Sequence, residues 1–195
     1  GFLGEEDGGH LEGSLERYWA IDPIDGTVNF LYDLPVMSVS IAATIDGQVV
    51  AGAVADVVRG EVFSGSRDTG VRRDDTPVTT SPTTNLSEAL VGTGFSYSSQ
   101  VRQREGEVVA RVLPAVRDIR CFGSAALHLC WVACGRLEAF YQEGLMEWDV
   151  AAGAFLAAVA GARVELGSES NNGLVLAATP GVFDPLRALI VGDRA

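Results

Sequence analysis

At residues 22–27 the chain reads Asp22-Pro23-Ile24-Asp25-Gly26-Thr27. Pro23 fixes its own φ and favours an extended Asp22, while Gly26 allows the backbone to approach closely. Both carboxylates can therefore converge on one hard cation, and magnesium prefers such oxygen ligands. The same residues also fit a plain turn in which Asp22 starts an Asx turn and Asp25 caps a helix. The segment alone leaves both interpretations open.

A short helical turn is predicted directly after these carboxylates, from Gly26 to Leu31. The first amides of a helix have no partner within it, and together with the helix dipole they suit a phosphate group. The amides of Gly26, Thr27 and Val28 would open this turn. A metal ion and an anion would then meet at one place.

Two further acidic features lie far from this segment in the sequence. At residues 148–153, Trp148-Asp149-Val150-Ala151-Ala152-Gly153, a lone acid precedes an Ala-rich apolar helix. Asp149 there can act as an ordinary N-cap, or it can bond an amide with one oxygen and a cation with the other. Glu5 and Glu6 stand in a predicted loop after Phe2 and Leu3, where a solvated charged pair is the usual interpretation.

The first half of the chain is predicted to be an antiparallel meander. Strands are expected at 17–21, 36–45, 48–58, 61–66 and 70–73, with the first one ending at Asp22-Pro23. Asp46-Gly47 joins two of them and is a strong signal for a two-residue hairpin.

The second half is predicted to alternate between strands and helices. Residues 76–87 are rich in Thr, Ser and Pro and form a connection over the surface, which separates a lobe 1–85 from a lobe 86–195 of one catalytic domain. Such alternation argues for helices packed on a second sheet. The expected strands are 89–93, 118–122, 137–141, 163–166 and 173–177, and the expected helices are 100–112, 124–133, 149–160 and one from Pro180.

The composition excludes some classes of partner. The 26 acidic and 14 basic residues give a net charge of −12, so nucleic acid and an anionic membrane surface would be repelled. A phosphate substrate would then need local cations, for which bound metal is the natural source. The sequence contains no run of about 18 apolar residues, so no membrane span is predicted.

The cysteines predict a reducing, cytoplasmic setting. Cys121, Cys130 and Cys134 form an odd set, and no signal peptide is recognised. Cys130 and Cys134 are spaced to share one helix face, but buried thiols explain them better than a metal site.

The acidic motifs together resemble the inositol monophosphatase family, and the actinobacterial branch most closely. Its first signature has the form W-x-x-D-P-x-D-G-T-x-N-F, and residues 19–30 read Trp19-Ala20-Ile21-Asp22-Pro23-Ile24-Asp25-Gly26-Thr27-Val28-Asn29-Phe30. The second, W-D-x-A-A-G, is present at 148–153, and Gly-Glu-Glu stands upstream as in the family. The similarity also includes Gly123-Ser124-Ala125-Ala126.

The resemblance implies a fold, an activity and a cofactor. The fold is an α/β layered sandwich of the inositol monophosphatase and fructose-1,6-bisphosphatase type, with an antiparallel sheet, a second mixed sheet, and helices between and outside. The activity is hydrolysis of inositol 1-phosphate by metal-activated water, with two or three Mg²⁺ ions, inhibition by lithium and a homodimer. Histidinol phosphate, fructose 1,6-bisphosphate and nucleotide 3′-phosphate are alternative substrates, and a non-catalytic interaction protein with a relic site is the alternative from another class.

The resemblance also implies roles for single residues. The implied metal ligands are Glu5, Asp22, the carbonyl of Ile24, Asp25 and Asp149, with Asp22 bridging two ions. Thr27 with Glu5 would position the attacking water, and the amides of Gly26 and Thr27 would hold phosphate. The implied substrate contacts are Asp25, Gly123, Ser124, Ala125, Gln142 and Asp149.

Two departures from the family pattern bear on these expectations. Gln142 replaces an acidic residue that usually receives inositol hydroxyls, which weakens the expectation for the substrate because a carboxylate makes stronger hydrogen bonds. Family members also begin with a pair of helices and a loop that do not precede Gly1. One face of the first sheet is then expected to be uncovered, with exposed apolar surface.

Overall fold

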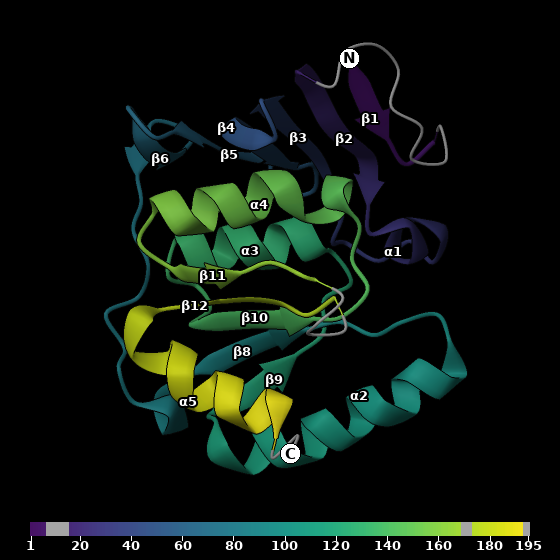
Figure 1. The fold of residues 1–195 in the computed structure, drawn as a ribbon, viewed down its shortest axis with the longest axis vertical. Helices are drawn as coiled ribbons and strands as arrows, with labels where there is room; N and C mark the ends of the chain where they lie inside the picture. The colour runs from purple at the N-terminus through teal and green to yellow at the C-terminus, as the bar shows by residue number, and fades with distance from the viewer. Residues whose placement is uncertain (7–15, 169–172, 193–195) are drawn as a thin grey trace.

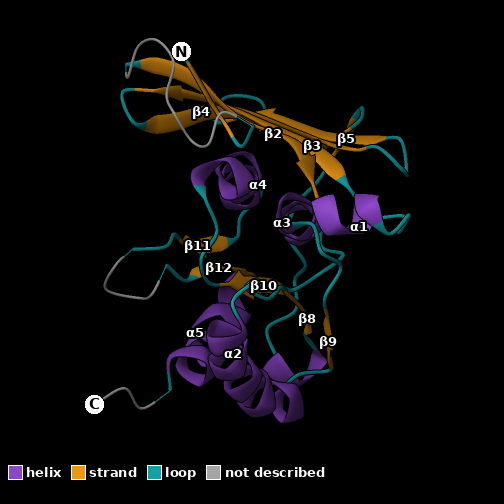
Figure 2. Ribbon diagram, turned by 90° about the vertical axis from the view of Figure 1, so that its right-hand side faces the viewer, coloured by secondary structure: helices purple, strands orange, loops and turns teal. Residues whose placement is uncertain are grey.

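The structure is a computed structural model that describes residues 1–6, 16–168 and 173–192. Two β-sheets lie one above the other with a pair of helices between them, and further helices cover the outer side of the second sheet (Figures 1 and 2). This is the layered α/β sandwich, with helices between and outside the sheets, that the resemblance implied.

The first sheet has seven strands, which follow one another in space in the order of the sequence. They are β1 (Phe2–Gly4), β2 (Arg17–Asp25), β3 (Ser38–Ile45), β4 (Gln48–Asp56), β5 (Glu61–Ser66), β6 (Gly70–Arg73) and β7 (Thr76–Pro77). All neighbours pair antiparallel except β1 and β2, which are parallel. The predicted meander is therefore confirmed, with β7 an addition inside the predicted connection.

The hairpin between β3 and β4 forms where the sequence predicts it. Asp46 and Gly47 both have positive φ, 49° and 73°, and Ile45 pairs with Gln48 across them. Two positive φ angles are typical of a type I′ turn, whose twist matches the flanking strands.

The start of this sheet differs from the prediction in two places. Residues 2–4 form a strand that was not predicted, β1, because they pair along β2, and Glu5 and Glu6 follow it in a turn, in agreement with the loop predicted for them. β2 does not end at Asp22-Pro23 but continues to Asp25, with a shift of register between Asp22 and Asp25 that accommodates a proline without an amide proton.

The second sheet is mixed and has the strand order β11-β12-β10-β8-β9. Its strands are β8 (Leu90–Thr93), β9 (Asp118–Arg120), β10 (Ala139–Gln142), β11 (Arg163–Glu165) and β12 (Val175–Ala178). The helices are α1 (Thr27–Leu31), α2 (Ser99–Val112), α3 (Ala125–Ala133), α4 (Glu147–Val159) and α5 (Pro180–Val191), with short 3₁₀ turns η1 (Leu86–Glu88) and η2 (Leu113–Ala115). α4 begins two residues before the prediction, since Glu147 and Trp148 form its first turn.

The main apolar core lies around α3 and α4, between the sheets (Figure 2). All nine residues of α3 are buried, which explains why this helix carries no charge. A second apolar cluster joins the other face of the second sheet to α2 and α5. None of the described helices has both the length and the apolarity needed to cross a membrane.

The outer face of the first sheet carries exposed apolar side chains in the described part of the chain. Among the described residues no helix lies over it (Figure 2), and Phe2 and Trp19, which pair in register, are 55% and 48% exposed. Val62 on β5 is 43% exposed. The expectation of exposed apolar surface on this sheet is confirmed.

Candidate active site

Parallel pairing places the first two acidic segments side by side. Gly4 at the end of β1 stands opposite Ile21 on β2, so the next residues, Glu5 and Asp22, are neighbours. Electrostatic repulsion from Glu5 is one of the factors that raise the pKa of Asp22. The strand that the sequence prediction missed therefore brings Glu5 to the site.

Asp22 is almost completely buried, with 2% of its surface exposed. Its Oδ1 accepts a hydrogen bond from the Ile24 amide at 2.9 Å, as the Asx-turn interpretation expected, and no described residue bonds its Oδ2. Burial, followed by repulsion from Asp25, raises its pKa to about 7. The turn and a cation site are therefore compatible, because they use different oxygens.

Asp25 caps a different helix from the one expected. Its Oδ1 accepts the Ala125 amide at 3.1 Å, and its Oδ2 accepts the Ala126 amide at 2.9 Å. The hydroxyls of Ser38 and Ser124 also donate to Oδ2. These are the first amides of α3, whereas α1 has Gly26 as its N-cap residue and no side-chain cap. Of the two interpretations that the segment left open, the one in which Asp25 caps the adjacent helix does not hold, because its carboxylate bonds the first amides of α3.

Asp149 lies in the first turn of α4, at its third residue and not at its N-cap. Its Oδ2 accepts the Met146 amide at 2.7 Å, and no described residue bonds its Oδ1. Burial, followed by repulsion from Asp25 and Glu5, raises its pKa to about 6. The two oxygens of Asp149 can therefore serve different partners, one an amide and the other a cation, which is one of the two interpretations that the sequence left open.

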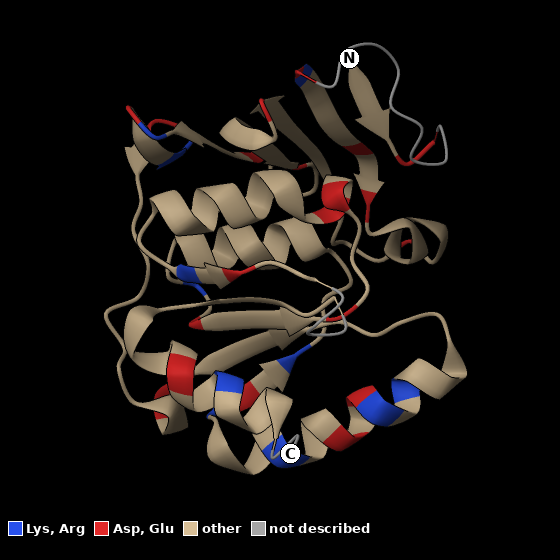
Figure 3. Ribbon diagram, in the orientation of Figure 1, with Lys and Arg blue, Asp and Glu red and all other residues tan. Residues whose placement is uncertain are grey.

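The four carboxylates lie together without a basic partner. Figure 3 shows the acidic ends of β1 and β2 beside the acidic start of α4, with basic segments elsewhere. All 14 basic residues are arginines, and no arginine in the described ranges forms an ion pair with Glu5, Asp22, Asp25 or Asp149. Asp22 and Asp25 are buried, and a bound cation would stabilise the charged forms of such closely spaced carboxylates.

The donor set fits a hard divalent cation in its chemistry. Asp22 Oδ2 and Asp149 Oδ1 are uncommitted oxygens, and Asp25 Oδ1 accepts only one hydrogen bond. Within residues 1–6, 16–168 and 173–192, no three acidic, His or Cys side chains converge closely enough to enclose an ion by themselves. Magnesium usually takes only one or two carboxylates and completes its shell with water and phosphate oxygens, so the set suits that ion.

The turn after β2 holds Thr27 and Gly26 beside these carboxylates. The Thr27 hydroxyl donates to the Ile24 carbonyl at 3.0 Å. Gly26 has a φ of 100°, and a Cβ there would lie 3.0 Å from the Val36 carbonyl and 3.3 Å from the Gly123 carbonyl. Only glycine fits this turn, and its close approach brings Gly123 against the segment that the sequence singled out.

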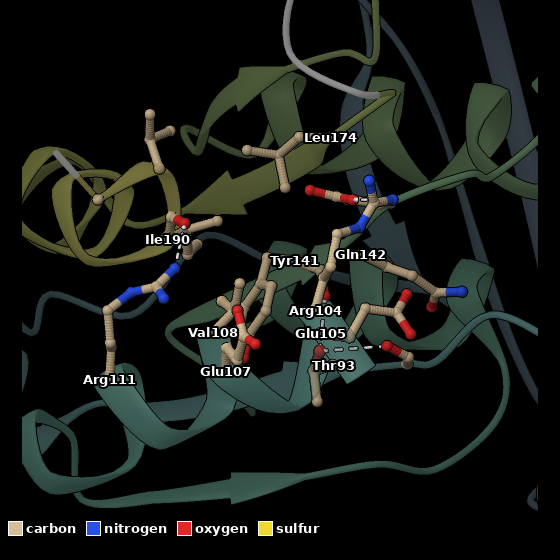
Figure 4. Close-up of a pocket in the computed structure, with 14 residues that line it drawn as sticks. Thr93, Arg104, Glu105, Glu107, Val108, Arg111, Tyr141, Gln142, Leu174 and Ile190 are labelled. Carbon is tan, nitrogen blue, oxygen red and sulfur yellow. Dashed lines mark hydrogen bonds and ion pairs between the residues drawn. The ribbon is translucent and has the colours of Figure 1, made fainter. Parts of the chain in front are cut away.

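Gln142 lies at the end of β10, at a cavity of about 560 Å³ between the second sheet, α2 and α5 (Figure 4). Its side chain covers the backbone of Gly94, where a Cβ would meet Oε1 at 1.9 Å. The side chain hydrogen-bonds to no described residue, so it is available to a ligand. Arg104, Arg111 and Glu107 also line this cavity, which adjoins β8 and β10 on the side of α2 and α5.

Some residues around the site were not anticipated. Ser38 donates to Asp25, and Asn29 bonds the carbonyls of Val36 and Phe122. No sequence signal marks Ser38 beyond its place near a strand start, and Asn29 stands out only as part of the quoted signature. His128, for which the sequence suggested no role, is buried. His10 lies outside the described residues.

Comparison with known proteins agrees with this geometry. Residues 1–192 match the model of the inositol monophosphatase family. The chain belongs to this family. The inositol-1-monophosphatase of Mycobacterium bovis is 47% identical over 199 residues, which cover 96% of this chain and 69% of that protein. The Nus factor SuhB of Xylella fastidiosa is 39% identical, over 84% of this chain and 59% of that protein.

Solved structures of the inositol monophosphatase family confirm the fold. Mycobacterium tuberculosis SuhB matches with a TM-score of 0.87 and 47% identity, over 97% of this chain and 75% of that chain. Family membership supports a phosphatase that acts on a small phosphorylated substrate.

Proposed function

We propose that this chain is a magnesium-dependent phosphomonoesterase that hydrolyses inositol 1-phosphate to inositol and phosphate. The observation that carries the proposal is the gathering of Glu5, Asp22, Asp25 and Asp149 from three separate segments, with no described arginine paired to any of them. In a member of this family, such a set is best explained as the ligands of Mg²⁺ ions that bind with the substrate phosphate.

The metal ligands would be the four carboxylates and the carbonyl oxygen of Ile24, for two or three ions. Mg²⁺ held there would lower the pKa of a water and neutralise charge on the phosphoryl and leaving oxygens. The Thr27 hydroxyl donates its proton to Ile24 and can therefore only accept from that water. Thr27 would then orient the water while Glu5 receives its proton, and the amides of Gly26 and Thr27 would hold the phosphate.

The substrate ring would lie near Gly123, Ser124 and Ala125, with Asp25, Asp149 and Gln142 around it. The Ser124 hydroxyl and the Ala125 amide both donate to Asp25, so they are already used. We therefore assign their contribution to shape and to the position of Asp25. The side chain of Gln142 is free to hydrogen-bond to substrate hydroxyls, so in this proposal Gln142 determines the substrate specificity.

The direct test is phosphate release from inositol 1-phosphate in the presence of Mg²⁺. Asp22→Asn should lower kcat/KM by roughly 100-fold or more, because losing a ligand should cost at least as much as losing a residue that only supports one. Asp68→Asn makes the same change on an exposed turn and serves as the matched control. Equal activity of Asp22→Asn and the control would sink the proposal.

Other small phosphates are the alternative within the same chemistry. Histidinol phosphate, fructose 1,6-bisphosphate and a nucleotide 3′-phosphate should be compared with inositol 1-phosphate by kcat/KM. Gln142 is compatible with these alternative substrates, because its amide both donates and accepts hydrogen bonds, whereas a carboxylate only accepts them.

An interaction protein is the alternative from another class, and it is favoured by relatives that carry the name Nus factor. The complete carboxylate set supports the enzyme instead. Calorimetric titration with Mg²⁺ separates the two, since a relic site would bind none at millimolar concentration. Lithium inhibition, a homodimer and a cytoplasmic location remain parts of the proposal, and the three free cysteines support the last.

A further inference from the structure

The peptide that leads into the candidate substrate turn is held from two sides. The Asn29 Nδ2 group donates to the Phe122 carbonyl at 2.6 Å and to the Val36 carbonyl at 2.8 Å. On the other side, the Phe122 amide donates to His128 Nε2 at 3.3 Å. Both polar groups of Phe122 are thus bound by side chains from different elements, α1 and α3.

His128 is fixed in one protonation state by these bonds. Because Nε2 accepts from an amide, it carries no proton, and Nδ1 must therefore carry one and donate to the Ser124 carbonyl at 2.7 Å. Burial lowers the pKa of His128 to about 4, in keeping with a neutral ring. One imidazole therefore joins the residue before Gly123 to the residue after it.

The ring of His128 has little freedom to move. It stacks on Phe140 with centroids 4.9 Å apart and planes at 14°. On β8, Gly92 leaves the necessary room, because a Cβ there would lie 2.5 Å from the ring. The imidazole, which extends from α3, therefore packs closely against β8 and β10 of the second sheet.

The turn that it holds carries the support of Asp25. Ser124 donates its hydroxyl to Asp25, and the next two amides, of Ala125 and Ala126, donate to the same carboxylate. Gly123 has a φ of 79°, and a Cβ there would lie 2.8 Å from Asn29 Nδ2. A displacement of Phe122 would therefore move the donors that orient Asp25.

We propose that His128 and Asn29 are positioning residues that clamp the Phe122 peptide and so hold the Gly123–Ser124 turn and the carboxylate of Asp25 in place. The catalytic part of this inference rests on the proposed function. The clamp itself does not, since it can be measured without substrate or metal.

The first experiment measures the clamp in the free protein. Long-range ¹H–¹⁵N correlation at pH 7 should show His128 with a protonated Nδ1 and an unprotonated Nε2. The opposite tautomer, or a charged ring, would overturn the assignment of its hydrogen bonds.

The second experiment uses His128→Phe, which keeps an aromatic ring against Phe140 but removes both hydrogen bonds. Exchange of the Ala125 and Ala126 amides should be about 10-fold faster than in the parent after correction for global stability. Trp131→Phe is the matched control, because it changes the same aromatic cluster but its Nε1 has no hydrogen-bond partner in the described structure. Equal acceleration in both variants would overturn the clamp.

Asn29→Ala provides the same test from the other side and keeps the inference testable if His128→Phe does not fold. It should also accelerate exchange at Ala125 and Ala126, and an unchanged rate would contradict the clamp. In the active enzyme, either variant should lower kcat by about 10-fold with KM changed less than about 3-fold, since orientation is lost more than binding. If the parent shows no phosphatase activity but the variants accelerate exchange at Ala125 and Ala126 as expected, the proposed function is refuted and the clamp is not.

Discussion

Removing the carboxylate of Asp22 should stabilise the metal-free protein, although it should destroy activity. Asp22 is 2% exposed, and its pKa is raised from 3.8 to about 7, first by burial and then by repulsion from Asp25. The charged form is therefore disfavoured in the folded state. Asparagine keeps an oxygen for the Ile24 amide and removes the charge.

The sign and size follow from the two pKa values. A carboxyl whose pKa is raised by folding binds more protons folded than unfolded, so stability falls as pH rises from about 4 to 7. Above that range the full shift corresponds to ~4 kcal/mol. Relaxation around a buried charge reduces the effective penalty, so we expect Asp22→Asn to gain roughly 2–4 kcal/mol at pH 8 and about 1 kcal/mol or less at pH 4.5.

The assay is urea unfolding of both proteins in EDTA at the two pH values, with two-state behaviour verified. Asp68→Asn, the matched control, should change stability by less than about 0.5 kcal/mol at either pH. At pH 4.5 His128 also loses its proton on folding, because burial lowers its pKa from 6.5 to about 4, but this contribution cancels between parent and variant. If Asp22→Asn is no more stable than the parent at pH 8, the carboxylates do not repel one another as argued.

Three other predictions concern the metal, the core and the substrate. Millimolar Mg²⁺ should raise the Tm of the parent more at pH 8 than at pH 5.5, because protons compete with the metal for the carboxylates. It should raise the Tm of Asp149→Asn less than that of the parent. Equal Tm shifts at the two pH values, or in the two proteins, in a thermal melt would contradict the metal site. Gly153→Ala should lower the free energy of unfolding by about 1–3 kcal/mol, because the new Cβ would lie 2.7 Å from the Cβ of Leu129. Gly106→Ala lies in open space on α2 and should raise the free energy of unfolding by about 0.5–1 kcal/mol. Urea unfolding measures both variants, and equal effects would contradict close packing at Gly153. Gln142→Glu should raise kcat/KM for inositol 1-phosphate relative to a nucleotide 3′-phosphate by roughly 5-fold, and an unchanged ratio would remove Gln142 from the choice of substrate.

Local signals in the sequence predicted most of the elements. Asp46-Gly47 specifies its hairpin because few residues tolerate two positive φ angles, and Ser124 before an apolar run marks the start of α3, whose Leu127 amide it caps. These features depend on residues within a few positions of each other, which is why the sequence reveals them.

Features that depend on distant segments could not be predicted in this way. Three residues of β1 carry too little pattern to be recognised, and they form a strand only because β2 is there to pair with. Asp25 caps a helix 100 residues further along the chain, which no local capping rule anticipates. The grouping of Glu5, Asp22 and Asp149 came from resemblance, and tertiary structure was needed to show that no described arginine pairs with them.

The most direct test of the central claim is an anomalous difference map from a crystal of this chain grown with Mn²⁺, as a substitute for Mg²⁺, and a phosphate analogue. The account predicts at least one strong peak within about 2.5 Å of oxygens from Asp22 and from Asp25 or Asp149, with the analogue bound to the same ion. Full occupancy of the analogue without an anomalous peak among these carboxylates would contradict it.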